Sequence, residues 1–252
     1  MAYRFQCTAC GKCCYGQVPL TIEDAFRHAG LFPLAIVWTP ISEMSKDFAM
    51  VAKLGAVFTL PNRKKLATLI VPTAYLPVSF PCPALCDDNL CGIQADKPLR
   101  CRAMPFYPYR DEQYQAELLS FQPGWECDTS ESAPIVFDNK RITQREDFDA
   151  ERQALDRQHS DIQRYADYTL KYNPKILSSL AQAAQQRKAG QVVTSLSSFL
   201  TATRTPNAKD IAQKQLSVLN KYLEKTASFK ELADFHQYYQ MSLKEMGYLS
   251  SK

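Results

Sequence analysis

The residues of this sequence that could do chemistry are its nine cysteines, all of which lie between Cys7 and Cys127. The sharpest pattern is a C-x2-C-x2-C-C run formed by Cys7, Cys10, Cys13 and Cys14. Two thiolates separated by two residues can turn toward one metal ion or cluster, because a tight turn between them brings the sulfur atoms together. Gly11 lies inside the run and gives the backbone freedom for that turn. The run therefore predicts a metal site that uses one of the two adjacent cysteines and leaves the other free for a distant partner or a second site.

Five more cysteines lie in a proline-rich segment and just after it, namely Cys82, Cys86, Cys91, Cys101 and Cys127. Loops with so little regular structure are poorly ordered alone, and metal ligation would order them, since a structural zinc site contributes on the order of 10 kcal/mol to folding. The alternative is that some of the five are ordinary buried thiols. We predict a ligand set that leaves the role of Cys86 open and consists of Cys7, Cys10, Cys13, Cys14, Cys82, Cys91, Cys101 and Cys127.

An iron–sulfur cluster is the preferred occupant, because C-x2-C-x2-C spacing is nearer to that of bacterial ferredoxins than to the paired spacing of a zinc ribbon. Zinc is the alternative, since eight of the nine cysteines could fill two four-thiolate sites. An all-sulfur donor set disfavours calcium and magnesium. The histidines are expected to be packed or surface side chains on helices, at His28, His159 and His236. Basic residues beside the cysteines either offset the thiolate charge or remain solvated, and these are Arg4, Lys12, Arg100 and Arg102.

The elements that must position the cysteines begin with a short helix over residues 22–29, capped by Thr21. We expect a loop over residues 31–45, which two prolines interrupt, and one more helical turn over residues 41–51. Apolar runs at 56–60 and 66–71 flank a polar turn and predict a hairpin. Seven prolines from Pro72 to Pro108 exclude long helices and long central strands there.

The second half of the chain changes character at about Thr143, where a capping box precedes apolar residues at helical spacing up to Pro174. This pattern predicts a helix of about seven turns. Further helices are expected over residues 174–190 and 192–201, around 212–223, and from 228 to 247. The predicted fold is α+β, with a loop-rich cysteine-cluster metal domain of short helices and a small hairpin over residues 1–140. An α-helical bundle is predicted over residues 141–252.

The composition argues against a disordered chain, a collagen-like repeat and a coiled-coil rod. With 252 residues, a net charge of +4 and 46% hydrophobic residues, the chain is expected to fold around a core. No segment approaches the roughly 18 to 20 apolar residues of a membrane span, and the first seven residues lack the apolar region of a secretory signal. We therefore expect a cytoplasmic protein without a membrane span, whose cysteines bind metal or stay thiols instead of forming disulfides. Nucleic-acid binding is not expected, because the basic run at residues 63–65 is typical of a solvated turn.

The order of the motifs is similar to that of a known family. The series starts with Phe5-x-Cys7-x-x-Cys10-Gly11-x-Cys13-Cys14 and Leu20-Thr21-x-x-Asp24, and continues with Cys82, Cys91 and Lys97-Pro98-x-x-Cys101-Arg102-x-x-Pro105-Phe106. It resembles the YkgJ-like CxxCxxCC cysteine-cluster family of zinc- or iron-chelating proteins, over about residues 5–127. That family includes flagellin lysine methylases, which are associated with an iron–sulfur cluster. The resemblance implies metal binding and names no reaction. Two departures are Lys97, where the family usually has arginine, and the additional Cys86.

The expected function is to hold an iron–sulfur cluster or zinc, in a wider role that the sequence leaves open. One alternative, implied by the resemblance, is a cluster-containing protein-modifying enzyme similar to lysine N-methylases. Another is a zinc-stabilised interaction module that binds a protein partner through its helical half. Whether the chain is an enzyme stays open, because no nucleotide-binding motif or catalytic residue can be located. Aromatic residues near the later cysteines are expected to shield the metal, or else to line a pocket, and these are Phe106, Tyr107, Tyr109, Tyr114, Phe121 and Trp125.

Overall fold

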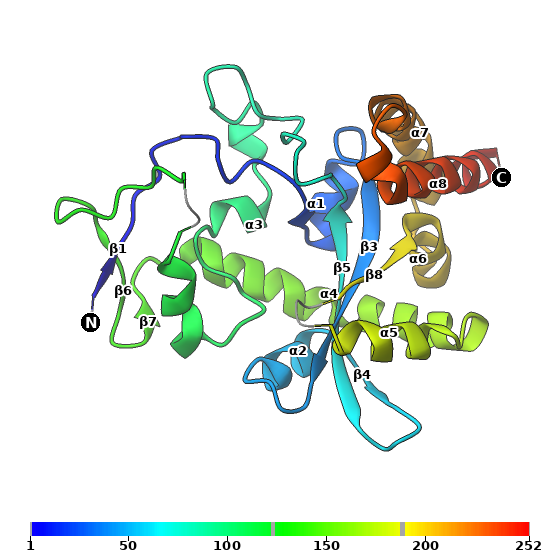
Figure 1. The fold of residues 1–252 in the computed structure, drawn as a ribbon, viewed down its shortest axis with the longest axis horizontal. Helices are drawn as coiled ribbons and strands as arrows, with labels where there is room; N and C mark the ends of the chain where they lie inside the picture. The colour runs from blue at the N-terminus through cyan, green and yellow to red at the C-terminus, as the bar shows by residue number, and fades with distance from the viewer. Residues whose placement is uncertain (1, 122–123, 187–189, 252) are drawn as a thin grey trace.

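The computed structural model describes residues 2–121, 124–186 and 190–251, and it combines helices and sheets as the sequence predicts (Figure 1). A five-stranded sheet lies at the centre, with the strand order β2-β5-β3-β8 and with β4 also paired to β5. All of its pairings are antiparallel. Its strands are β2 (Val18–Pro19), β3 (Leu34–Ser42), β4 (Ala56–Thr59), β5 (Lys65–Ala74) and β8 (Val192–Ser195).

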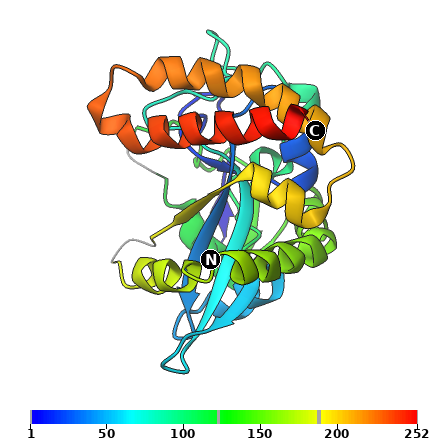
Figure 2. The ribbon, with the colours of Figure 1, turned by 90° about the vertical axis from the view of Figure 1, so that its right-hand side faces the viewer.

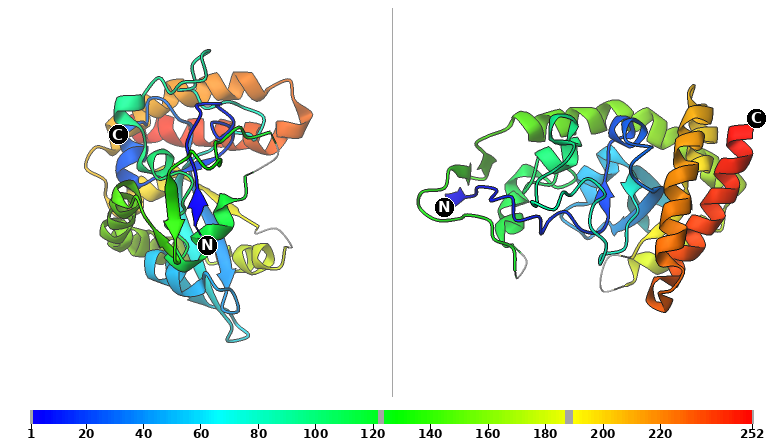
Figure 3. Two further views of the ribbon diagram at one scale, coloured as in Figure 1. Left: turned by 90° about the vertical axis from the view of Figure 1, so that its left-hand side faces the viewer. Right: turned by 90° about the horizontal axis from the view of Figure 1, so that it is seen from above.

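A second, three-stranded sheet lies at the opposite end of the molecule from the last two helices (Figure 3). Its order is β1-β6-β7, formed by Tyr3–Arg4, Ile135–Asp138 and Arg141–Ile142. Three phenylalanines, Phe106, Phe137 and Phe148, pack beneath it as a separate small core. This sheet ties the N-terminal segment to the residues that follow the last cysteine.

The prediction of a loop over residues 31–45 is wrong, because β3 occupies most of that segment. β3 pairs with β5 over its full length, from Leu34 opposite Ala74 to Ser42 opposite Leu66. A continuous apolar run is typical of a strand buried on both faces, and it lacks the alternation that identifies half-buried strands. Pro40 is tolerated within β3 because β8 pairs with β3 only as far as Trp38. Beyond Trp38, this edge of β3 has no strand that would need the missing N–H.

The predicted hairpin is confirmed as β4 and β5, but β5 continues three residues past the point where the sequence predicted loop. Pro72 therefore lies inside a central strand, opposite Ile36. Its carbonyl accepts the Leu20 N–H at 2.8 Å at the end of the β2 pairing. Pro72 has no N–H to donate, but its carbonyl still accepts a hydrogen bond on that edge of β5.

Three short α-helices lie within the described residues of the first half, together with the 3-10 helices η1 (Gln94–Asp96) and η2 (Glu112–Leu119). α1 (Ile22–Arg27) confirms the predicted helix, and the Thr21 hydroxyl accepts the Asp24 N–H at 3.0 Å as its cap. α2 (Phe48–Leu54) overlaps the end of the helical turn predicted over residues 41–51 and continues three residues past it. α3 (Leu99–Arg102) is a single turn in the proline-rich segment.

The second half supplies the long helices, listed as α4 (Glu146–Tyr172), α5 (Ile176–Ala184), α6 (Leu196–Thr203), α7 (Ala208–Thr226) and α8 (Ala233–Ser251). α4 matches the predicted long helix, although Thr143 donates to the Ile135 carbonyl and does not cap it. The predicted helix over residues 192–201 is wrong in its first part, because β8 adds those residues to the central sheet. The helix predicted over residues 174–190 is shorter in the structure, where α5 ends at Ala184. Residues 187–189 of that prediction lie outside the described ranges. α8 passes through Gly247, since a glycine within a helix costs only about 1 kcal/mol.

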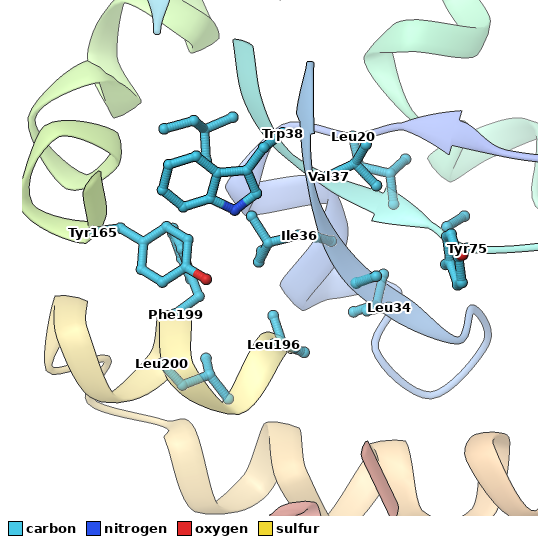
Figure 4. Close-up of a cluster of buried hydrophobic side chains, with 14 of the residues drawn as sticks. Leu20, Leu34, Ile36, Val37, Trp38, Tyr75, Tyr165, Leu196, Phe199 and Leu200 are labelled. Atoms are coloured by element: carbon cyan, nitrogen blue, oxygen red, sulfur yellow. The ribbon is translucent and has the colours of Figure 1, made fainter. Parts of the chain in front are cut away.

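The main core joins residues from both halves of the chain (Figure 4). The rings of Trp38 on β3 and Tyr165 on α4 lie 5.3 Å apart between centroids, and both side chains hydrogen-bond to Thr194 on β8. Figure 2 shows α7 and α8 side by side over the sheet. Tyr239 of α8 is fully buried and donates to the Tyr75 carbonyl at 2.6 Å. The apolar stripes of these helices are therefore buried within the chain, and core contacts cross the predicted boundary at residue 140.

In the described part of the chain, no helix combines the length and the apolar character that crossing a membrane requires.

Candidate metal centre

The first cysteine of the run and the last cysteine of the chain lie on two paired segments. Gln6 and Asp128 exchange both backbone hydrogen bonds, at 2.8 and 3.0 Å, in an antiparallel bridge. The next positions along this register are Cys7 and Cys127, and the Thr8 hydroxyl continues the contact by donating to the Glu126 carbonyl at 2.9 Å. Residues beyond a doubly bonded pair form a non-hydrogen-bonded pair, whose side chains lie closest together. Cys7 and Cys127 are therefore neighbours across 120 residues of sequence.

A second pairing joins the end of the run to the proline-rich segment. The Cys82 N–H donates to the Cys14 carbonyl at 2.8 Å, Tyr15 forms an antiparallel bridge with Pro81, and the Gly16 N–H donates to the Phe80 carbonyl. Cys14 and Cys82 are thus opposite each other in register. Cys82 also packs against the main core, so this part of the run is anchored to the central sheet.

Cys86 and Cys91 lie on a small hairpin of their own. Cys91 faces Leu85 in an antiparallel bridge, and the Cys86 N–H donates to the Leu90 carbonyl at 2.9 Å. The turn of this hairpin touches the cysteine run, because a Cβ on Gly11 would lie 3.0 Å from the Asn89 side-chain oxygen. Gly11 also has a φ of +71°, so both its conformation and its surroundings require glycine. Cys86 lies against Gly92 and the Ala84 carbonyl.

Cys101 is carried by α3, which two contacts fix in place. The Leu99 N–H at its start donates to the buried carboxylate of Asp24 on α1, at 3.1 Å. Arg100 forms a buried ion pair with Glu151 on α4, at 3.4 Å. In Figure 1 the segment that follows β1 and the loop before α3 both run above α3, so the cysteine-bearing segments gather on one side of the molecule.

The backbone between Cys7 and Cys10 donates a hydrogen bond to a cysteine sulfur. The Ala9 N–H donates to the Cys7 sulfur at 3.4 Å, and Ala9 adopts a left-handed φ of 56°. That conformation costs about 1 kcal/mol for a residue with a Cβ, and it aims an N–H dipole at the sulfur.

The adjacent thiols Cys13 and Cys14 form a hydrogen-bonded pair with opposite pKa changes. The hydrogen bond from Cys14 lowers the pKa of Cys13 to about 6, and the nearby charge of Lys97 lowers it further against the effect of burial. The same hydrogen bond, then burial and the neighbouring thiols of Cys13, Cys82 and Cys101, raise the pKa of Cys14 well above its usual range. One proton is thus shared within the pair, and a metal ion would have to displace it.

Burial raises the pKa of the other cysteines for which a change is resolved. It raises the pKa of Cys101 to about 12, and the pKa of Cys82 also rises, with Cys91 and Cys13 as its thiol neighbours. The pKa of Cys127 rises through burial and then through Cys10, Cys7 and Cys13. The thiols named here come from four separate segments of the chain. In the described ranges, no three or more His, Cys, Asp or Glu side chains are already arranged as a metal site.

Lys97, which departs from the usual arginine of the motif, is a cation that acts on two of the thiols. Lys97 lowers the pKa of both Cys13 and Cys101. Of the expected cations, Arg100 also lowers the pKa of Cys101, whereas Arg102 is paired with Asp147 at 2.5 Å. The sequence signal for Lys97 was its place four residues before Cys101, just ahead of the turn that becomes α3.

The histidines and aromatic residues lie in several different places. The His28 ring packs edge-on against Phe32, and His236 is 3.1 Å from the Thr226 hydroxyl. The six aromatic residues do not form one cluster. Phe106 belongs to the small core, and Tyr107 and Tyr109 contact each other in another core. The Tyr114 ring lies 5.0 Å from the Lys46 ammonium, and Phe121 and Trp125 form a stacked pair that touches Phe5.

A cleft of about 640 Å³ opens beside Cys7, between the small sheet and the start of α4. Its lining includes the apolar residues Phe5, Phe106 and Phe148 and the charged residues Arg102 and Glu146.

Comparison of the chain with protein-family models, with curated proteins and with solved structures finds no match. The resemblance to the YkgJ-like family therefore rests on the motifs alone.

Proposed function

We propose that this protein binds a metal centre through the thiolates of Cys7, Cys10, Cys13, Cys14, Cys82, Cys91, Cys101 and Cys127. The observation that carries the proposal is the pairing of Cys7 with Cys127 and of Cys14 with Cys82 in two antiparallel registers. None of these eight thiols is fully buried, and Cys7 and Cys13 are exposed, so packing in an apolar core does not account for the set. Sulfur is the only donor type that these positions share, which suits iron–sulfur clusters and zinc.

An iron–sulfur cluster is the preferred occupant, and zinc is the alternative. The C-x2-C-x2-C spacing favours a cluster, and the N–H donated to Cys7 is the kind of contact that tunes cluster sulfur. Such a cluster would supply electron transfer or a Lewis-acidic iron, whereas zinc would supply structural stability. Lys97 and Arg100 would offset part of the negative charge of the bound thiolates. A cytoplasmic location, where thiols stay reduced, belongs to the same proposal.

The deciding experiment is metal analysis of protein purified without air. A cluster predicts a brown protein with broad visible absorption and with iron and sulfide in equal amounts. Zinc predicts a colourless protein that carries zinc. Protein that is free of iron and zinc, and that binds neither on addition, would refute the proposed function.

The cleft beside Cys7 favours a second candidate, a cluster-containing protein-modifying enzyme similar to lysine N-methylases. Cys7 lines the cleft together with Arg102, Arg145 and Glu146, so a molecule bound there would lie next to the proposed metal centre. The candidate predicts binding of a methyl-donor cofactor in calorimetry. Absence of heat with metal-loaded protein would remove the methylase and leave the metal-binding proposal intact.

A further inference from the structure

We infer that the hairpin of β4 and β5 is an interaction surface for the phosphate backbone of duplex DNA. The tip of this hairpin carries three consecutive cations, Arg63, Lys64 and Lys65, and all three are exposed. Their local sequence indicates only a solvated turn, because it does not show where in the molecule the turn lies. The inference goes beyond the proposed metal binding and does not depend on it.

The tip projects from the rest of the molecule. In Figure 1 the hairpin forms the bottom of the structure and extends past α2 and α5, and Figure 2 shows the same projection after a turn of 90°. Residues 61–65 are all exposed. A two-stranded ribbon can enter the major groove of B-form DNA, which is about 12 Å wide. The projection therefore lets the tip approach a duplex without a collision between the DNA and the helices.

The hairpin is held in a fixed direction by its base and by its turn. At the base, Phe58 and Leu66 face each other in register and are both buried. At the tip, the Leu60 N–H donates to the Lys64 carbonyl, and the Arg63 N–H donates back to the Leu60 carbonyl, both at 2.9 Å. The backbone that carries the cations is therefore ordered before binding, and only their side chains have to be immobilised.

The cations at the tip are not neutralised by the part of the chain that the structure describes. On the neighbouring α2, Lys53 is paired with Asp156 at 3.0 Å. None of the three tip cations forms an ion pair with a described carboxylate. Three adjacent positive charges without a counter-charge create a local positive potential, which favours an anionic partner.

Duplex DNA suits the tip better than single strands, duplex RNA or a membrane. Proteins that bind single strands stack the bases on aromatic side chains, and residues 60–65 contain none. The major groove of RNA helices is too deep and narrow for side chains to read. Helices that lie on membranes bury large apolar side chains, whereas the exposed tip consists of Pro61, Asn62 and the three cations. Contacts to phosphates need only cations, which the tip supplies.

The tip and the cysteines lie at opposite ends of β5. The strand begins at Lys65 beside the tip and ends at Ala74, which faces Val18, shortly after Cys14. Its 10 residues span roughly 30 Å at about 3.3 Å each. Substitutions at the tip should therefore leave the metal content unchanged, so the failure of one proposal is distinguishable from the failure of the other.

The experiment measures binding of the whole chain to a short, fluorescein-labelled DNA duplex of mixed sequence by fluorescence anisotropy. Each phosphate contact contributes about −0.9 to the slope of the logarithm of the association constant against the logarithm of salt concentration. Three contacts predict a slope of about −2.7, which corresponds to a loss of roughly 40-fold in affinity between about 50 and 200 mM salt.

The test variant combines Arg63→Gln, Lys64→Gln and Lys65→Gln, which removes the cations from exposed positions. Its affinity for the duplex at about 50 mM salt should fall at least about tenfold, and its salt slope should approach zero. Circular dichroism and metal analysis check that the fold and the metal content are those of the wild type.

The matched control combines Lys209→Gln, Lys221→Gln and Lys244→Gln, at exposed lysines of α7 and α8. It removes the same three charges from the net charge of +4, so the two variants differ only in where the charge is lost. The control should bind the duplex with the affinity and the salt slope of the wild type.

Three results would overturn the inference. The first is an absence of duplex binding by the wild type at about 50 mM salt. The second is an equal loss of binding in the two variants, because binding would then follow the net charge and not the tip. The third is binding of the wild type to vesicles that contain phosphatidylserine but not to the duplex, with loss of vesicle binding in the tip variant. That result would assign the tip to a membrane surface.

Discussion

Cys7 and Cys127 lie directly opposite each other on two antiparallel segments, one position beyond the doubly hydrogen-bonded pair of Gln6 and Asp128. The first of these segments follows the N-terminal strand, and the second follows the proline-rich region. Their contact closes the loop that contains all nine cysteines. This closure brings the first and the last thiol of the chain together.

Mild oxidation of metal-free protein should link Cys7 to Cys127. A non-hydrogen-bonded antiparallel pair places its Cα atoms about 4.5 Å apart, which is within the range of disulfides. Peptide mapping by mass spectrometry after treatment with oxidised glutathione should find this link, and bound metal should prevent it. Equal cross-linking of Cys86 to Cys7 would show that the register is not maintained in solution.

Cys10→Ser should lower both metal content and stability, whereas Cys86→Ser should change both much less. Cys10 lies in the run and next to Cys127, while the Cys86 sulfur lies against Gly92 and the Ala84 carbonyl. Loss of one thiolate from a four-thiolate site weakens or abolishes binding, and the lost binding free energy is also lost to folding. Metal analysis and thermal unfolding of the two variants check this, and equal metal content in both would remove Cys10 from the ligand set.

Gly11→Ala should destabilise the protein by about 1 to 2 kcal/mol, because alanine is strained at a φ of +71°. The new methyl group would also lie 3.0 Å from the Asn89 side-chain oxygen and push the hairpin turn away from the cysteine run. Denaturant unfolding measures the change in free energy. Gly30→Ala is the control, since no atom lies within 4 Å of its Cβ position and its φ is not left-handed, so a similar loss there would discount the effect at Gly11.

Stability should fall as the pH rises from about 4.5 to about 7, in part because of Glu151. Burial raises the pKa of Glu151 from 4.5 to about 7, and Arg100 only partly opposes this change. The folded state therefore disfavours the ionised carboxylate. Protonated Glu151 contributes fully to stability below its unfolded-state pKa of 4.5, and this contribution is lost as the pH rises through the folded-state pKa of about 7. The loss amounts to roughly 3 kcal/mol at most. In Glu151→Gln the free energy of unfolding should depend less steeply on pH in this window, and an unchanged slope would exclude Glu151 as the cause.

A fragment of residues 1–140 should fail to unfold cooperatively. It would expose Trp38, which is fully buried against Tyr165 of α4 and hydrogen-bonded to Thr194 of β8. Burial of large aromatic side chains dominates the stability of a core, so the loss of these partners is decisive. Tryptophan emission during denaturant titration checks this result. A sharp transition with buried-tryptophan emission would show that the first half folds by itself.

Local patterns predicted the elements whose signals are local. The hairpin of β4 and β5 and the helices α1, α4, α7 and α8 follow from turn residues, caps and apolar spacing, which act within a few residues of each other. The same patterns failed at Leu34–Ser42 and at Val192–Ser195. These two strands pair with each other across more than 150 residues, and each is a strand because of its partner.

By itself, the sequence determined which chemical groups are present and where a metal can be sought, since residue types and close spacing suffice to predict a thiolate site at Cys7–Cys14. Only the tertiary structure decided which thiols are neighbours, because the contacts of Cys7 with Cys127 and of Cys14 with Cys82 are set by backbone pairing between distant segments. It also brought Lys97 to Cys13 and Cys101. Pairing register is a property of two segments together, and neither segment contains it alone.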